Sequence, residues 1–226
     1  MTIDEFKTKF VSIKAMGFVQ STRKGPTGVG HTLETLLGIK ENNIYHPDIE
    51  GIEIKAHRTK ANNLITLFTF NRKAWKIPPL QAVKKYGSLD KNGRVGLYYT
   101  MSLKPNSAGL FLDITNKTIS VRHISGNIIA EWNIESIAER FRTKIPALLF
   151  VSAFKEDRDN IEYFHFYRAQ LMSGTCSNLL ANQFRNENIL VDLRLHDKGT
   201  MARNHGTGFR VFEDKLPLLF ESIKDL

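Results

Sequence analysis

The sequence predicts a folded α+β protein, because amphipathic helical segments stand beside a strand-rich middle. The chain has 226 residues, of which 42% are hydrophobic and 10% aromatic, enough to build one large domain or two lobes. No apolar run approaches the roughly 18 residues needed to cross a bilayer, and the N-terminus carries no signal core. We therefore expect a cytoplasmic protein. The single cysteine, Cys176, excludes an internal disulfide and a cysteine-based zinc site.

Apolar residues at helical spacing predict the helices. The clearest case is 3–16, where Ile3, Phe6, Phe10 and Ile13 recur and Gly17 follows as a stop. Further helices are expected over 29–37, 134–142, 175–184 and 213–222.

Runs rich in β-branched and aromatic residues predict the strands. We expect 50–57 to be a short strand and 63–70 a strand in the centre of a sheet. Residues 95–133 should form an antiparallel meander with a hairpin turn at 125–127. Two more strands, 147–154 and 161–167, should flank a polar turn.

One short stretch could carry chemistry: Pro47-Asp48, followed after four intervening residues by Glu53-Ile54-Lys55. On a strand, Glu53 and Lys55 point to one face and Ile54 to the other. Carboxylate oxygens suit a hard cation such as Mg²⁺, and a neighbouring lysine can orient or deprotonate a water. The pattern is that of metal-dependent phosphodiester hydrolases of the PD-(D/E)xK type. Taken alone, the pattern is better explained by a solvated strand face, because Glu-x-Lys occurs easily by chance and Glu213-Asp214-Lys215 repeats the spacing.

The charge distribution favours a polyanionic partner. The formal net charge is +9, which favours nucleic acid or an acidic membrane surface as a partner. A loop with three glycines carries Arg23 and Lys24, and it could approach a phosphate or be a plain connector. Residues 71–94 interleave cations with aromatics and prolines and include Lys73, Lys84 and Lys85. They fit either an arm along a phosphate backbone or a solvated basic loop.

A second cluster favours reading of bases. Alternation places Asp192, Arg194 and His196 on one face of a strand, and Arg210 lies on a second β segment. From 194 to 210 there are four Lys/Arg and two His against one acid. Arginine can bind guanine O6 and N7 together, and Asp can accept from cytosine N4.

Taken together, several motifs resemble the MvaI/BcnI family of type II restriction endonucleases, relatives of the mismatch-repair nickase MutH. The matching segments are Gly25-x-Thr27-Gly28-x-Gly30-x-Thr32-x-Glu34-x-Leu36-Leu37, Pro47-Asp48, Ile52-Glu53-Ile54-Lys55-x-His57, Leu64-x-Thr66-Leu67-Phe68-Thr69, Val191-Asp192-x-Arg194 and His205-Gly206-Thr207-x-Phe209-Arg210. They cover both ends of the chain. The middle, about 71–170, contributes little.

The resemblance implies a restriction-endonuclease-like fold, with helices around a mixed central sheet and two lobes forming a DNA-binding cleft. The catalytic lobe would comprise about 1–70 plus part of the middle strands, and the recognition lobe about 171–226. The implied catalytic residues are Glu34, Asp48, Glu53 and Lys55, and the implied ligands of Mg²⁺ are Asp48, Glu53 and Ile54. Base contacts would come from Asp192, Arg194, Arg203, His205 and Arg210, and backbone contacts from Arg23, Lys24, Lys73, Lys84 and Lys85.

The implied activity is Mg²⁺-dependent cleavage of double-stranded DNA at a short site of the CC-N-GG kind. The enzyme would be a monomer that cuts one strand at a time, and a cognate DNA methyltransferase would protect the host. One better-known member carries histidine where Arg203 stands here, a side chain that could select the central base pair. Two alternatives are a MutH-like nickase for hemimethylated DNA and a non-catalytic DNA-binding module.

Overall fold

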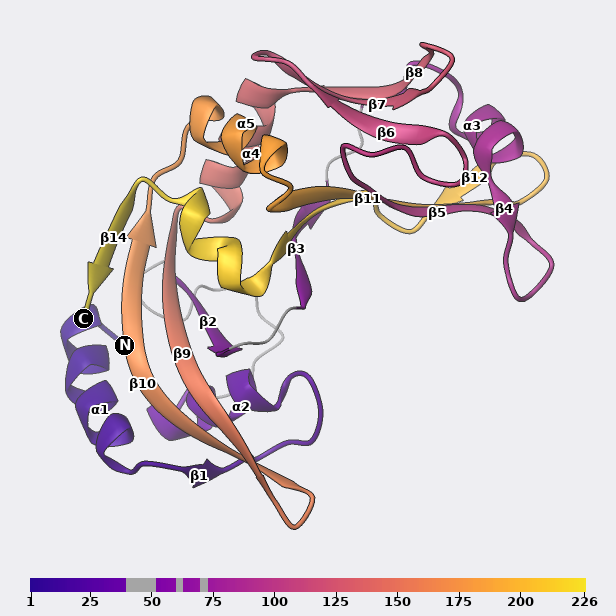
Figure 1. Ribbon diagram of the computed structural model, residues 1–226. Coiled ribbons are helices and arrows are strands. Elements are labelled where there is room, and N and C mark those ends of the chain that lie inside the picture. Colours follow the sequence, from indigo (N-terminus) through magenta and orange to yellow (C-terminus); the bar gives the residue numbers. More distant parts are fainter. Residues whose placement is uncertain (40–51, 60–62, 70–72) are drawn as a thin grey trace. The chain divides into compact units, whose positions relative to one another are not determined.

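The computed structural model describes residues 1–39, 52–59, 63–69 and 73–226, which form two compact units (Figure 1). Unit 1 comprises 1–62, 145–174 and 220–226, and unit 2 comprises 63–144 and 175–219, in each case over their described parts. In the described part of the chain, no helix is long and apolar enough to span a membrane.

Unit 1 is built on a mixed sheet with the strand order β1-β10-β9-β2. Its strands are β1 (Val19–Gln20), β2 (Glu53–Arg58), β9 (Ala147–Arg158), β10 (Ile161–Ser173) and β14 (Ser222–Asp225), the last pairing with the end of β10. β2 runs parallel to β9, and the other pairings are antiparallel. The helices among the described residues of this unit are α1 (Ile3–Ala15) and α2 (Gly28–Leu37).

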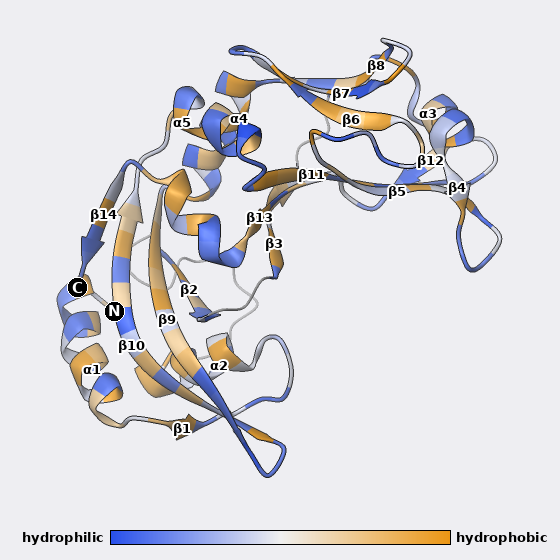
Figure 2. Ribbon diagram, in the orientation of Figure 1, coloured by the Kyte–Doolittle hydropathy of each residue, from blue (hydrophilic) through white to orange (hydrophobic). Residues whose placement is uncertain are grey.

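The core of unit 1 lies between these helices and one face of the sheet. Phe6, Phe10 and Ile13 of α1 are buried there, as the helical spacing predicts. From α2, Leu33 and Leu37 join the same core, and Ile54 of β2 meets them from the sheet. Strand β9 is hydrophobic over most of its length and hydrophilic towards its hairpin end (Figure 2). Because Ile54 packs into this core, Glu53 and Lys55 lie on the opposite face of β2.

The described residues of unit 2 form two antiparallel sheets. The larger has the order β3-β13-β11-β5-β4, with β12 also paired to β11, and the smaller is β6-β7-β8. The strands are β3 (Leu64–Thr69), β4 (Ser88–Leu89), β5 (Val95–Met101), β6 (Leu110–Ile114), β7 (Thr118–His123), β8 (Ile128–Asn133), β11 (Ile189–Asp197), β12 (Ala202–Asn204) and β13 (Gly208–Phe212). The helices are α3 (Pro79–Tyr86), α4 (Ile134–Lys144), α5 (Ser177–Arg185) and the 3₁₀ helix Glu213–Leu219.

Phe209 of β13 is the centre of an aromatic core in unit 2. Its ring lies 5.4 Å from that of Phe68, 5.5 Å from Trp132 and 5.9 Å from Phe184, between ring centroids. Phe209 itself is fully buried. Edge-to-face and tilted contacts of this kind are favourable beyond the area they bury, so β13 is firmly held next to the segment predicted to read bases.

The mixed α+β class is confirmed, but four local predictions are wrong in detail. Strand β3 lies at an edge of the described sheet, because only β13 pairs with it there. Strand β5 pairs with β11 and so leaves the meander to β6, β7 and β8. The β9–β10 hairpin continues to a two-residue turn at Asp159 and Asn160, which both have positive φ, as tight hairpin turns require.

The fourth difference concerns the C-terminus. Residues 213–219 form a 3₁₀ helix containing Pro217, and β14 follows in place of further helix. Proline lacks the amide proton that an α-helix interior needs, so a regular helix over 213–222 is disfavoured.

Candidate functional site

Glu53 and Lys55 lie side by side on the open face of β2. The Lys55 Nζ is 3.3 Å from the Glu53 Oε1, and the Lys55 and Glu53 side chains are 38% and 49% exposed. Ile54 between them is buried in the core of unit 1. The predicted alternation is confirmed. A carboxylate and an ammonium are therefore presented together to solvent from a strand whose other face is fixed by packing.

The other two predicted catalytic residues have different outcomes. Asp48 lies outside the described residues. Glu34 is half-buried on α2, a helix that packs against β2. Among the described residues, no group of three His, Cys, Asp or Glu side chains is arranged to hold a metal. The described part of the site thus supplies Glu53 and Lys55.

His57 continues the same face of β2. Its Nε2 lies 2.8 Å from the Ser152 Oγ on β9, and its ring stacks on Phe150 with centroids 4.2 Å apart. Phe150 is also the register partner of Lys55 across the parallel pair. These contacts hold β2 against β9 at the position of Lys55. The sequence offers no signal that His57 contacts Ser152, because the two residues are 95 positions apart.

In unit 2, Asp192 gathers the two predicted base-reading arginines. Its Oδ2 accepts from Arg194 Nε at 2.9 Å and from Arg210 Nη1 at 3.1 Å, and its Oδ1 accepts from Thr100 Oγ1 at 3.1 Å. The Asp192 side chain is 6% exposed, against 43% for Arg194 and 26% for Arg210. Arg210 also donates from Nη2 to the Leu64 carbonyl. A buried carboxylate thus aligns two guanidinium groups whose side chains are partly exposed, although the Nε of Arg210 is itself buried.

A second polar cluster lies further along β11. The His196 Nδ1 is 2.9 Å from the His205 Nε2 and 3.2 Å from the Tyr98 hydroxyl. His205 is exposed and His196 is buried, with their rings stacked. Arg203 is exposed and pairs in register with His196 across β12 and β11. His196 therefore contacts His205 through its ring, whereas Arg203 is only its register neighbour on the next strand. The strand alternation predicted the face on which His196 lies but not its contact with His205.

Burial lowers the pKa of His196 below its ordinary value, and nearby positive charge lowers it further. The charged or titratable neighbours are Arg94, His205, Lys198 and Arg203. The folded protein therefore keeps His196 neutral at pH values where the unfolded chain would bind a proton there.

This shift predicts an acid-sensitive stability. As pH falls from about 6.5, the usual histidine pKa, towards the lowered folded value, the unfolded state gains protons and stability falls. Above that range His196 contributes no pH dependence. Urea unfolding across this window should show the midpoint dropping in the wild type and dropping less in His196→Gln. Parallel curves for the two proteins would contradict the assignment.

The predicted backbone-binding cations divide between the units. Arg23 and Lys24 are exposed on the loop before α2 in unit 1. Lys84 and Lys85 are exposed on α3, and Lys73 is exposed before it, all in unit 2. Each unit by itself therefore presents cations at its surface.

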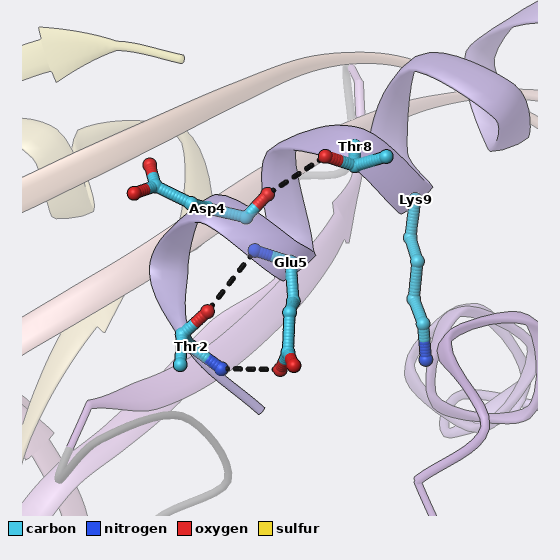
Figure 3. Close-up of a pocket in the computed structure, with 5 residues that line it drawn as sticks. All are labelled: Thr2, Asp4, Glu5, Thr8 and Lys9. Carbon is cyan, nitrogen blue, oxygen red and sulfur yellow. Dashed lines mark hydrogen bonds between the residues drawn. The ribbon is translucent and has the colours of Figure 1, made fainter.

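A pocket beside the first turns of α1 is unrelated to these residues (Figure 3). It is lined by Thr2, Asp4, Glu5, Thr8 and Lys9. Thr2 and Glu5 form a reciprocal capping box, Thr8 donates to the Asp4 carbonyl, and Lys9 donates to the Leu37 carbonyl. These groups cap and dock the helix, and none of them is a predicted site residue.

Comparison with known proteins identifies the family of the chain. The model of the MvaI/BcnI restriction endonuclease family matches residues 7–220. A solved structure described as a restriction endonuclease MvaI–cognate DNA substrate complex is 26% identical, with a TM-score of 0.69, covering 98% of this chain and 97% of that one. Restriction endonuclease MvaI in the absence of DNA is 25% identical, with a TM-score of 0.64 and coverage of 99% and 96%. No curated protein matched the chain. The family match over nearly the whole length and the similarity to the MvaI structures show that this chain belongs to the MvaI/BcnI restriction endonuclease family and is a site-specific deoxyribonuclease.

Proposed function

We propose that the protein is a Mg²⁺-dependent type II restriction endonuclease that cuts double-stranded DNA at a short site of the CC-N-GG kind. The observation that carries the proposal is the exposed pair of Glu53 and Lys55 on β2, preceded in sequence by Pro47-Asp48. A module that only binds DNA has no use for a carboxylate facing phosphates. The solved MvaI complex with cognate DNA supports a DNA duplex as the substrate.

The donor set of β2 fits a hard divalent cation. Glu53 offers a half-exposed carboxylate, Asp48 would add a second, and Ile54 can contribute only its main-chain carbonyl. All of these donors are oxygens, which Mg²⁺ prefers together with water and phosphate. When bound, Mg²⁺ supplies charge stabilisation at the scissile phosphate and acidifies a water.

Lys55 would hold the attacking water in line with the scissile phosphate. Its ammonium is already kept close to the Glu53 carboxylate, so it is placed at the edge of the proposed metal site. Glu34 would complete the acidic site from α2. Hydrolysis would leave a 5′-phosphate and a 3′-hydroxyl.

Base recognition would come from the β11–β13 face. Arg194 and Arg210 would each bind a guanine, while Arg203 and His205 would read the neighbouring positions. Asp192 holds both arginines through its Oδ2, so a base contact of its own to a cytosine would use Oδ1, which also accepts from Thr100. Arg23, Lys24, Lys73, Lys84 and Lys85 would contact phosphates, which makes binding strongly salt-dependent.

The sequence contains one such Pro-Asp and Glu-x-Lys combination, so we propose that a monomer makes a double-strand break by two successive nicks. With supercoiled plasmid and Mg²⁺, nicked circles should accumulate before linear DNA. Sequencing the ends of the linear product would give the target and the cut position. Direct conversion to linear DNA without a nicked intermediate would contradict sequential cutting, and intact plasmid would contradict the activity itself.

A host that carries such an enzyme needs protection of its own sites. We propose a cognate DNA methyltransferase as its genetic partner, with both proteins acting in the cytoplasm.

A further inference from the structure

Arg58, the last residue of β2, holds the glycine-containing loop that precedes α2. Its Nη1 donates to the Pro26 carbonyl at 3.0 Å and its Nη2 to the Gly25 carbonyl at 2.8 Å. Gly25 has φ of +86°, a conformation that other residues rarely adopt. The guanidinium therefore connects the strand that bears Glu53 and Lys55 directly to this loop.

The guanidinium is itself fixed from the sheet. Its Nη2 lies 3.2 Å from the Glu162 Oε2, and its carbon lies 5.3 Å from the centre of the Phe164 ring. The other oxygen of Glu162 is 2.9 Å from the Lys155 Nζ. The Arg58 and Glu162 side chains are only 14% and 20% exposed. A planar fork with several simultaneous partners is a role that lysine cannot reproduce.

The loop is also attached at its other end. The Ser21 amide donates to the Glu162 carbonyl at 2.8 Å, and the Thr22 amide donates to the Thr32 Oγ1 at 3.0 Å. A Cβ on Gly28 would collide with the Arg23 carbonyl, which shows how closely the loop is folded. Between these attachments, the Arg23 and Lys24 side chains remain exposed. The backbone of the 21–27 loop is therefore held by hydrogen bonds at both ends, while it carries two exposed cationic side chains.

We propose that Arg58 is a positioning residue for DNA binding, which preorganises the 21–27 loop so that Arg23 and Lys24 meet the phosphate backbone. This inference rests on the proposed function. A loop held in place before binding loses less conformational entropy on association than a free one. Arg58 ends the strand that carries Lys55. Its hydrogen bonds to the Gly25 and Pro26 carbonyls therefore fix the position of the loop relative to Glu53 and Lys55.

The test is a double-mutant cycle on duplex affinity. The variants are Arg58→Gln, the pair Arg23→Ala with Lys24→Ala, and all three together. The probe is a short fluorescent duplex, titrated at several salt concentrations with Ca²⁺ in place of Mg²⁺.

The double variant Arg23→Ala with Lys24→Ala, here called the loop pair, should lower the slope of log affinity against log salt by about 0.9 for each phosphate that is no longer neutralised. Arg58→Gln should weaken binding in the same way but less, and the triple variant should be no weaker than the loop pair. Arg58→Lys should restore only part of the affinity.

Arg168→Gln is the matched control. Arg168 makes a two-pronged ion pair with Asp225 on the same sheet, away from the loop. It should leave affinity and salt slope unchanged, and thermal melting would show that every variant folds. Additive effects in the triple variant, or an unaltered slope in Arg58→Gln, would overturn the inference. A wild-type protein that binds no duplex would instead refute the proposed function, so the two failures are distinguishable.

Discussion

Replacing Glu53 by glutamine abolishes DNA cleavage and leaves sequence-specific binding in place: this is the largest effect we expect. The amide keeps the shape of the side chain but loses the charge that a divalent cation needs. Metal-based stabilisation of a phosphate contributes several kcal/mol, and about 1.4 kcal/mol is tenfold in rate. The nicking rate should therefore fall by about three orders of magnitude or more. Lys55→Ala should have a comparable effect, because the attacking water is no longer oriented.

Glu156→Gln provides a matched control for this experiment. Glu156 is a similarly exposed carboxylate on the same sheet, 2.9 Å from Arg158, and it lies on β9 outside the proposed site. Its replacement should leave the nicking rate unchanged. Cleavage is followed on plasmid, and binding is followed on a labelled duplex that contains the target. If Glu53→Gln or Lys55→Ala cuts at the wild-type rate, the catalytic site is wrongly assigned.

The second large effect is a drop in sequence discrimination in Arg194→Ala and in Arg210→Ala. Without its bidentate arginine, each position should favour the cognate base by roughly 1–3 kcal/mol less than in the wild type. The measured quantity is the ratio of affinities for target and single-base variants, because absolute affinity also reflects phosphate binding. The affinity for unrelated duplex should change much less than this ratio.

The two arginines should also be coupled through Asp192. Both donate to its Oδ2, so removing one partner changes the position of the other. Discrimination in Arg194→Ala with Arg210→Ala should therefore differ from the sum of the single effects. Arg122→Ala is the control, because Arg122 is a partly exposed arginine of the same unit that pairs with Asp113 outside the predicted base-reading set. If Arg194→Ala and Arg210→Ala keep the wild-type ratio of affinities for the target and for every single-base variant, these arginines do not read bases.

The sequence predicted what depends on local periodicity. The alternation of Glu53, Ile54 and Lys55 follows from strand geometry alone, as does the shared face of Asp192 and Arg194. The fold class followed from the same patterns together with the family resemblance. What sequence could not predict were contacts between distant segments, such as those of His57 with Ser152 and of Arg58 with Gly25.

Pairing partners of strands were hard to predict for the same reason. Strand β5 looks like the start of a meander, yet it pairs with β11, which comes much later in the chain. A hydrophobic run indicates that a strand is buried but does not identify its neighbour. The pairing also brings Thr100 to Asp192 and Tyr98 to His196. The polar partners of these two residues could therefore not be predicted without the order of the strands.

The aromatic anchor at Phe209 has a consequence for how new target preferences could arise. Arg210, immediately next to it, points to the partly exposed side of β13, while the phenyl ring is locked among three other aromatic rings. If Arg210 reads a base as proposed, substitutions on the outward side of β13 change the chemistry offered to that base, while the inward side preserves the backbone path. Because the two sides of β13 are separate in this way, the target sequence could change during evolution without repacking of the core.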